Sequence, residues 1–326
     1  MPTLELTPEW DKTFPRDSQV HHEKVEFATR FGTVLAADLY RPRDIEGQLP
    51  AIAVSGPFGA VKEQASGLYA QTLAAFGFLT IAFDPSFTGE SSGHPRYVAS
   101  PDINTEDFSA AVDFLSLHPL VNSEQICILG ICGWGGIALN AAAVDSRIKA
   151  TVASTMYDLT RVSAFGYNDG VGIDERHELK VQLNQQRIED MRNGSYARAG
   201  GVVDPLPDDA PTFIKDYHAY YKTERGYHPR SLNSTHGWNR TSALSFLNAK
   251  SLQFTDEIRS AVLLIHGEQA HSRYFSETAF ERLSSRYPQN KELLIIPEAN
   301  HTDLYDQMLI IPFEKIHEFF TNSLGL

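Results

Sequence analysis

The sequence predicts an α/β fold built on a mainly parallel β-sheet, because short apolar runs alternate with helix-length segments along most of the chain. The chain has 326 residues, enough for one large domain or for a core domain that carries an insertion. No repeat period or low-complexity tract is visible, which excludes solenoids and disordered arrays. We therefore expect a sheet with helices on both faces.

The first elements predict an antiparallel start to this sheet. Val25–Arg30 and Val34–Pro42 are strand-like runs joined around a Phe-Gly turn, as in a hairpin. Ala51–Gly56 is a continuous apolar run that ends in glycine, as expected of a strand buried on both faces. The parallel part of the sheet is therefore expected to begin at Ala51.

The remaining strands and helices follow in alternation. The predicted strands are Phe78–Asp84, Ile126–Gly130, Lys149–Thr155, Ala261–Gly267 and Glu292–Ala299. The predicted helices are Gln64–Phe76, Asn104–Leu117, a small-residue helix that begins within Gly136–Ala143, and the amphipathic Phe313–Leu324. Helices between successive strands are typical of right-handed parallel crossovers.

One long segment breaks this alternation. Between Thr160 and about Lys250 there is no strand-like run, but a polar helix at Asp174–Gly194 and then an aromatic-rich stretch. We interpret residues 160–250 as a helical lid or cap, inserted into a core of residues 1–159 and 251–326. The alternative is that this segment covers the edge of the sheet and shapes no pocket.

Composition limits the partners and the cofactors. The formal net charge of −13 would repel phosphate backbones and anionic headgroups, so nucleic acid and a membrane face are not expected partners. Cys127 and Cys132 make neither a disulfide framework nor a zinc pattern, and we expect no metal and no cofactor. The N-terminus lacks the features of a signal peptide, and no 18-residue apolar run is present. A cytoplasmic protein is expected, with a homodimer as the candidate assembly.

The glycine-rich turn after the strand Ile126–Gly130 carries the strongest chemical signal. In ICILGICGWGGIALNAAA a buried strand runs into a tight turn and then a helix, which is the setting of a nucleophile elbow. Cys132 then occupies the nucleophile position, and the helix N-terminus behind it is expected to lower the pKa of its thiol. Trp134 stands two residues later, where a small residue is usual. Either Cys132 is the nucleophile of an elbow one residue longer than usual, or there is none.

The partners of Cys132 are sought in chain order. His301 follows the last predicted strand and is the expected base. The acid is less clear, because Ala270 stands where an aspartate is expected after the strand Ala261–Gly267. Glu268 is the first candidate for the acid. The other two are Asp158, which could instead cap a helix, and Asp303.

The oxyanion of an acyl-transfer reaction needs backbone N–H groups. The amide of Gly133, next to the nucleophile, is one expected donor. The backbone amide of Phe58, in the turn at residues 57–59, is the second expected donor. The alternative is that this turn only reverses the chain direction. Aromatic residues of the predicted lid would line an apolar pocket for an acyl or aromatic ester substrate; they are Phe213, Tyr217, Tyr220, Tyr221 and Trp238.

The motifs together resemble a known family. Stretches such as VSGPFGAVKEQ, FDPSFTGESSG, LGICGWGGIALNAAA, IHGEQAHSRYFSE and NHTDLYDQ resemble α/β-hydrolases of the dienelactone-hydrolase-like group, in particular bacterial members with a GICGWGG or GICASGG elbow. The resemblance implies the α/β-hydrolase fold, with a mostly parallel eight-stranded sheet and a helical insertion. It also implies a cysteine nucleophile at Cys132, a histidine at His301, and small ester, lactone or thioester substrates. Trp134 and Ala270 depart from the pattern of the group.

Two other classes of function compete with hydrolysis. A catalytically degraded member of this fold would act as a binding protein, as the departures at Trp134 and Ala270 would allow. An acyltransferase would use the same cysteine and pass the acyl group to an acceptor other than water. Halide and epoxide chemistry is excluded, because the elbow holds no carboxylate.

Overall fold

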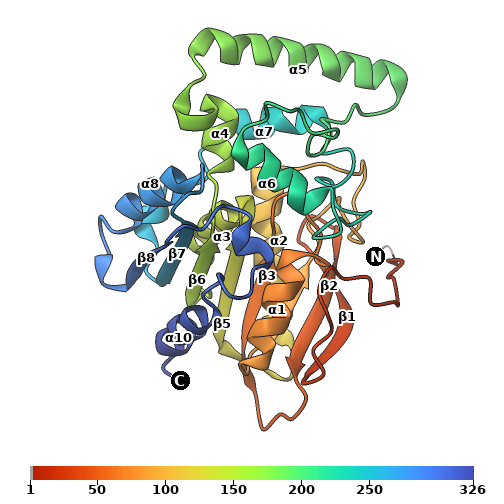
Figure 1. Cartoon of the computed structure of the whole chain (residues 1–326). Helices are drawn as coiled ribbons and strands as arrows, with labels where there is room; N and C mark the ends of the chain where they lie inside the picture. Colours follow the sequence, from red (N-terminus) through yellow and green to blue (C-terminus); the bar gives the residue numbers. More distant parts are fainter. Residues whose placement is uncertain (1–2) are drawn as a thin grey trace.

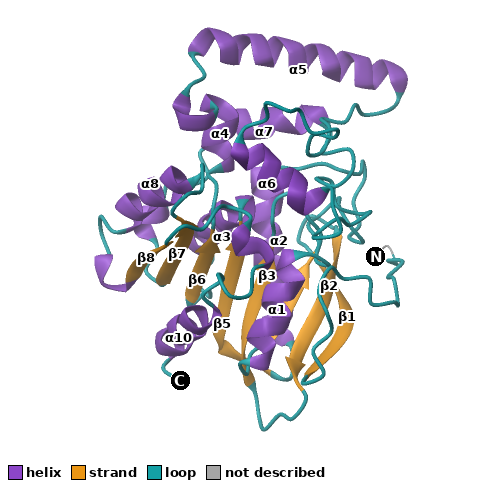
Figure 2. Ribbon diagram, in the orientation of Figure 1, coloured by secondary structure: helices purple, strands orange, loops and turns teal. Residues whose placement is uncertain are grey.

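A twisted β-sheet forms the centre of the protein (Figure 2). The computed structural model describes residues 3–326, and within them the sheet has eight strands in the order β1-β2-β4-β3-β5-β6-β7-β8. The strands are β1 (Val20–Ala28), β2 (Val34–Pro42), β3 (Leu49–Ser55), β4 (Leu79–Phe83), β5 (Val121–Ile131), β6 (Ala150–Ser154), β7 (Ala261–Gly267) and β8 (Lys291–Ile296). β2 pairs antiparallel with β1 and β4, and all other pairs are parallel. The predicted α/β fold class is confirmed.

Helices cover both faces of the sheet (Figure 1). α1 (Ala65–Ala75) and α10 (Phe313–Leu324) lie in front in this view, whereas α2 (Pro101–Leu117) and α3 (Gly133–Val144) lie behind. α8 (Arg273–Leu283) packs against β7 and β8, and the one-turn helix α9 (Asp303–Asp306) contacts α1. The residues of β4 and β6 are all buried, which agrees with their uninterrupted apolar runs.

The chain between β6 and β7 lies above the sheet in Figure 1 and contains four α-helices within the described residues. They are α4 (Leu159–Phe165), α5 (Ile173–Asn193), α6 (Thr212–Tyr221) and α7 (Ala243–Leu247). We refer to residues 160–250 as the insertion. It contacts the loop after β3, where the side-chain amide of Asn233 donates to the carbonyl of Phe58 over 2.8 Å. The insertion therefore lies over the end of the sheet at which the parallel strands finish.

α5 differs from the other helices in its exposure. Leu183 and Asp190 are its only buried residues among 21, and Figure 1 shows it spanning the top of the molecule. Its hydropathy is low, in agreement with the polar helix predicted at Asp174–Gly194. Among the described helices, none combines the length and the apolar character that a membrane span needs.

Candidate active site

The turn after β5 presents Cys132 directly at the start of α3. Cys132 has φ 58° and ψ −129°, a left-handed backbone conformation that non-glycine residues rarely adopt outside strained turns. Glycines allow the close approach that this turn needs: a Cβ at Gly130 would overlap the carbonyl of Trp134, and one at Gly136 would overlap the carbonyl of Tyr157. α3 begins at Gly133, so the chain passes from β5 into α3 through Cys132 alone. We refer to this turn as the elbow.

Trp134 fits this turn because its side chain points away from the thiol. Its indole is fully buried between Phe83 of β4 and Phe108 of α2, with ring centroids 5.6 and 5.3 Å away. Both contacts are edge-on, an arrangement that aromatic rings favour. Trp134 is therefore a core residue behind the elbow, and it leaves the space beside Cys132 to Gly133.

The thiol of Cys132 is buried and surrounded by donors. Its side chain interacts with the hydroxyl of Tyr305 and with the backbone N–H groups of Gly133 and Phe58. Only 8% of the residue is exposed. Burial raises the pKa of the thiol, against the opposing effect of these three donors. The expected net lowering of the pKa by the helix N-terminus is thus wrong, since removal from water outweighs it.

The structure brings Phe58 and Gly133 to the same side of the elbow. A Cβ at Gly133 would lie 2.7 Å from the Cβ of Phe58, which shows how closely the two backbones approach. The insertion fixes the loop that carries Phe58. The hydroxyl of Ser231 and the backbone N–H of Asn233 both donate to the carbonyl oxygen of Gly59. The backbone N–H groups of Phe58 and Gly133 therefore face the thiol of Cys132.

A buried ion cluster holds the other end of this loop. The ammonium of Lys62 lies 2.6 Å from Glu63, 3.0 Å from Asp84 and 2.6 Å from Glu90. The three carboxylates bring oxygens within 4.8 Å of one another, as a metal site would. Because the Lys62 ammonium contacts all three, the cluster carries its own cation and serves to tie the loop to the end of β4.

His301 lies after β8, where the sequence predicted the base, and it is 2% exposed. Its Nε2 is 3.0 Å from the hydroxyl of Tyr305, which in turn contacts the thiol of Cys132. Its Nδ1 is 2.8 Å from the hydroxyl of Thr155 and 2.7 Å from that of Ser272. Burial lowers the pKa of His301 well below its usual range, so the imidazole is neutral at pH 7. Cys132 and His301 are thus brought together with one phenol between them.

The candidate acids do not reach this histidine. The Glu268 carboxylate accepts from the amide of Glu298 over 3.0 Å, and that of Asp303 accepts from the amide of Asn300 over 2.8 Å. Asp158 caps α4, where it accepts from the amide of Arg161 over 2.9 Å. Each carboxylate therefore orders a backbone turn, and the structure gives the imidazole Nδ1 two hydroxyl partners instead of the carboxylate that we expected.

Hydroxyl groups and a second histidine take the place of that acid. Ser272, two residues after Ala270, also lies 2.9 Å from Nε2 of His266, and Nδ1 of His266 lies 2.7 Å from Ser276. All of these side chains are buried. Sequence reasoning missed Thr155, Ser272 and Tyr305. The available signal was their position: Thr155 is the last residue of a predicted strand, Ser272 follows the strand Ala261–Gly267 by five residues, and Tyr305 follows His301 by four.

The aromatic residues predicted for the lid separate into three groups. Burial raises the pKa of Tyr217 and Tyr221, and the charge of an ionised Cys132 would raise it further, which places both phenols near the thiol. The Tyr220 hydroxyl instead contacts the backbone of α1. Phe213 stacks on His271 at 4.2 Å, and Trp238 stacks on Phe58 at 4.6 Å. Of the five, the phenols of Tyr217 and Tyr221 are therefore the ones placed near the thiol of Cys132.

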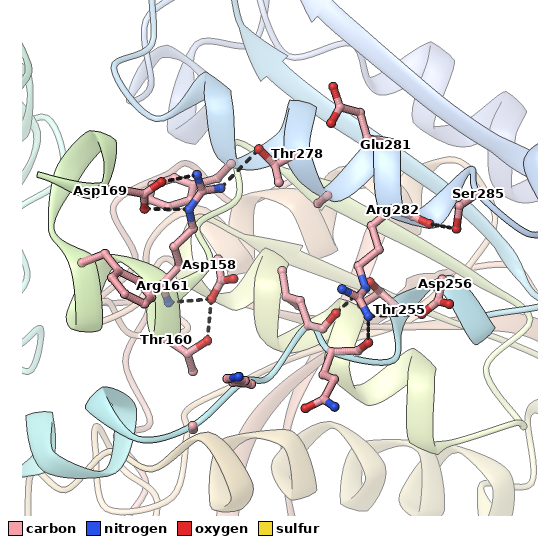
Figure 3. A pocket seen from close by; sticks show the side chains of 17 residues that line it. Asp158, Thr160, Arg161, Asp169, Thr255, Asp256, Thr278, Glu281, Arg282 and Ser285 are labelled. Atoms are coloured by element: carbon pink, nitrogen blue, oxygen red, sulfur yellow. Dashed lines mark hydrogen bonds and ion pairs between the residues drawn. The ribbon is translucent and has the colours of Figure 1, made fainter.

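A large cavity lies beside this site but does not include Cys132. It has a volume of about 1250 Å³ and lies between α4, α8 and residues 249–256. Figure 3 shows Arg161 on one side of it, paired with Asp169 and bonded to Thr278. The ring of Phe275 lines this cavity and packs 5.0 Å from Tyr157, whose ring lies 5.2 Å from His301. Two aromatic side chains thus separate the cavity from His301.

Comparisons with known proteins identify the family of this chain. Residues 32–303 match the family model described as X-Pro dipeptidyl-peptidase (S15 family). The chain belongs to the S15 family. Together with its structural neighbours, this match places the S15-family protein among the α/β-hydrolases.

Sequence relatives of this S15-family protein cover most of its length. PA2218 of Pseudomonas aeruginosa is 58% identical over 98% of this chain and 86% of its own. YcjY of Escherichia coli is 34% identical over 83% of this chain and 88% of its own. A thiohydrolase of Aspergillus aculeatus, aneE, is 28% identical over 67% of this chain and 61% of its own.

Solved structures extend the comparison. The crystal structure of PA2218 has a TM-score of 0.96 and 57% identity, and it covers 99% of this chain and 100% of that one. The α/β-hydrolase GrgF from Penicillium has a TM-score of 0.77 at 20% identity, over 94% of this chain and 100% of that one. This second likeness supports the fold of the S15-family protein and nothing finer.

Proposed function

We propose that this protein is an acyl hydrolase that uses Cys132 as its nucleophile and His301 as its base, with small esters, lactones or thioesters as substrates. The observation that carries the proposal is the elbow. Its thiol faces two backbone N–H groups and is linked through the Tyr305 hydroxyl to the buried imidazole of His301. This is the arrangement that acyl transfer through a covalent intermediate needs. The name thiohydrolase, given to the relative aneE, supports the thioester as one of the three substrate classes.

The resting groups are neutral, which determines how the nucleophile is activated. Burial raises the pKa of the thiol and lowers that of His301, so no thiolate–imidazolium pair is stored before substrate arrives. The sulfur attacks the carbonyl carbon while its proton moves toward His301, and the carbonyl oxygen gains its charge beside the N–H groups of Gly133 and Phe58. A cysteine, as in dienelactone hydrolases, suits a base without a carboxylate partner because a thiol ionises more readily than a hydroxyl.

Acyl transfer to another acceptor is the second candidate. It is favoured by the burial of Cys132 under the insertion, which limits water at the acyl group. Relatives described as polyketide transferases support it; grgF of Penicillium is 32% identical over 42% of this chain and 45% of its own. The same acyl-cysteine intermediate serves both reactions, and the acceptor decides between them.

The test compares wild type with Cys132→Ala on aryl acetates, S-acetyl-N-acetylcysteamine and small lactones. Cys127→Ala is the matched control, because Cys127 is a second buried cysteine inside β5. We expect turnover and an acetyl adduct, read by intact mass spectrometry, in wild type and the control but not in Cys132→Ala. Added alcohols or amines that raise product formation above hydrolysis would indicate transfer. Turnover that survives Cys132→Ala would refute the cysteine nucleophile, and wild type without turnover or adduct would favour a binding protein.

A further inference from the structure

We propose that Tyr305 is a further catalytic residue, whose hydroxyl carries the proton of the Cys132 thiol to Nε2 of His301. This inference rests on the proposed function and adds a group that the elbow motif does not contain. Tyr305 is the side chain that contacts both partners: its hydroxyl interacts with the thiol and lies 3.0 Å from Nε2 of the histidine.

The position of this phenol is fixed by its surroundings. Tyr305 is fully buried on α9, and its amide N–H donates to the carbonyl of Thr302 over 3.1 Å. Its ring meets those of Tyr220 at 5.0 Å and His301 at 5.4 Å, both edge-on. A ring held on several sides keeps its hydroxyl between the two groups, which is what a proton carrier needs.

The hydrogen bonds allow one consistent order of protons. If Nδ1 of His301 carries the hydrogen, it donates to the hydroxyl oxygens of Ser272 and Thr155, and Nε2 is free to accept. Tyr305 then donates its hydroxyl hydrogen to Nε2, and its oxygen accepts from the neutral thiol; once the sulfur is ionised, the hydroxyl donates to the sulfur instead. Every group in this arrangement is neutral, in agreement with the burial of the whole set.

The chemical step follows from this order. The S–H bond of Cys132 breaks and its proton passes to the oxygen of Tyr305, while the original O–H bond of Tyr305 breaks and that proton passes to Nε2 of His301. The electron pair left on sulfur forms the bond to the carbonyl carbon, and the carbonyl π pair moves to oxygen. Tyr305 is neutral before and after, so the phenol transfers a proton without storing charge. When the tetrahedral intermediate collapses, the leaving oxygen or sulfur takes the proton back.

The far side of the imidazole is held by hydrogen bonds. Ser272 lies 2.7 Å from Nδ1 of His301 and 2.9 Å from Nε2 of His266. As His301 takes up the proton at Nε2, its Nδ1 hydrogen stays bonded to Ser272, whose own hydroxyl donates to the neutral His266. Ser272 and His266 are thus positioning residues, which act on the reaction through His301.

The experiment measures the acetylation of Cys132 by 4-nitrophenyl acetate, and separately its alkylation by iodoacetamide, which needs no turnover. Tyr305→Phe, His301→Ala and the double variant form a cycle. Tyr69→Phe is the matched control, since that buried phenol donates to the carbonyl of Leu304, next to Tyr305. We expect Tyr305→Phe to lower both rates about 100-fold, as loss of a general acid–base does, with KM nearly unchanged and Tyr69→Phe close to wild type.

The cycle separates a proton carrier from a structural residue. If Tyr305 acts through His301, removal of its hydroxyl should change the rates less than about threefold when His301 is already alanine. Equal losses in both backgrounds would overturn the proposal, as would wild-type rates in Tyr305→Phe.

A second experiment uses the wild type alone, so it does not depend on folding of the variants. The acetylation rate is measured in mixtures of H₂O and D₂O, and the curve of rate against D₂O fraction is corrected for the isotope preference of the thiol itself. We expect this curve to fit the transfer of two protons in the rate-limiting step. A one-proton dependence would refute the carrier. Failure of the proposed function would appear differently, as alkylation without acetylation.

Discussion

Replacing His266 by glutamine tests the neutral state of the buried hydroxyl and imidazole groups behind His301. His266 is fully buried, and its two ring nitrogens lie 2.9 Å from Ser272 and 2.7 Å from Ser276. Burial, together with His271 and Arg273, lowers the pKa of His266 from its ordinary 6.5 to about 3. Glutamine can bond to a serine hydroxyl but does not titrate.

The magnitude follows from the difference in proton binding between the two states. Between pH 6.5 and pH 3 the unfolded chain binds a proton at His266 and the folded protein does not, so the stability of the fold decreases as the pH falls. The effect is absent above pH 6.5 and grows by about 1.4 kcal/mol per pH unit below it. At pH 4 the folded wild type should therefore have lost about 3 kcal/mol through this one side chain.

Urea unfolding at pH 7, 5 and 4 measures this loss. The free energy of unfolding of wild type should fall about 3 kcal/mol more than that of His266→Gln over this range, whatever the other groups contribute to both proteins. His177→Gln on the exposed face of α5 is the matched control and should follow wild type. If the curves of wild type and His266→Gln stay parallel, His266 is not held neutral by burial, and the proton order deduced for the site is wrong.

Three further variants test the elbow. Cys132→Ser should fold normally but lose about 10³-fold or more in turnover, because a serine depends on a carboxylate-supported histidine; a stopped assay with a folded-state check by circular dichroism decides this. Gly133→Ala should lower kcat about 100-fold, as loss of an oxyanion donor does, since its Cβ would come 2.7 Å from that of Phe58; Gly170→Ala, in ordinary contact, should not. Trp134→Ala should cost about 3–5 kcal/mol in urea unfolding, and a cost below 1 kcal/mol would contradict its core role.

The sheet could be predicted because its signals are local. The apolar run Ala51–Gly56 corresponds to β3, and the polar helix predicted at Asp174–Gly194 corresponds to α5 within one residue at each end. β1 begins at Val20, five residues earlier than predicted, because its first part alternates partly exposed histidines and charges that carry no apolar signal. The apolar pattern of a buried strand is therefore visible in the sequence, whereas the start of a partly exposed edge strand such as β1 is not.

The candidate site could be predicted only in part. Cys132 and His301 stand at positions that the order of strands fixes, so their approach follows from topology. The partners of the imidazole come from Thr155 after β6 and Ser272 before α8, and hydroxyl residues at loop ends are too common to signal a role. The reversal of the thiol pKa shift was also out of reach, because it depends on how completely the insertion and Tyr305 remove the sulfur from water.

A thiol that rests in its protonated form is a poor target for oxidants. Peroxide reacts with thiolates that are exposed, and it converts them to sulfenic and then sulfinic acids. Cys132 is 8% exposed, and burial keeps its pKa above the ordinary value, so few molecules carry the vulnerable form at any moment. In the proposed mechanism, the arrangement that delays activation until a substrate is bound would therefore also protect the sulfur between turnovers. A nucleophile of this kind would keep its function under oxidative conditions that inactivate exposed cysteine enzymes.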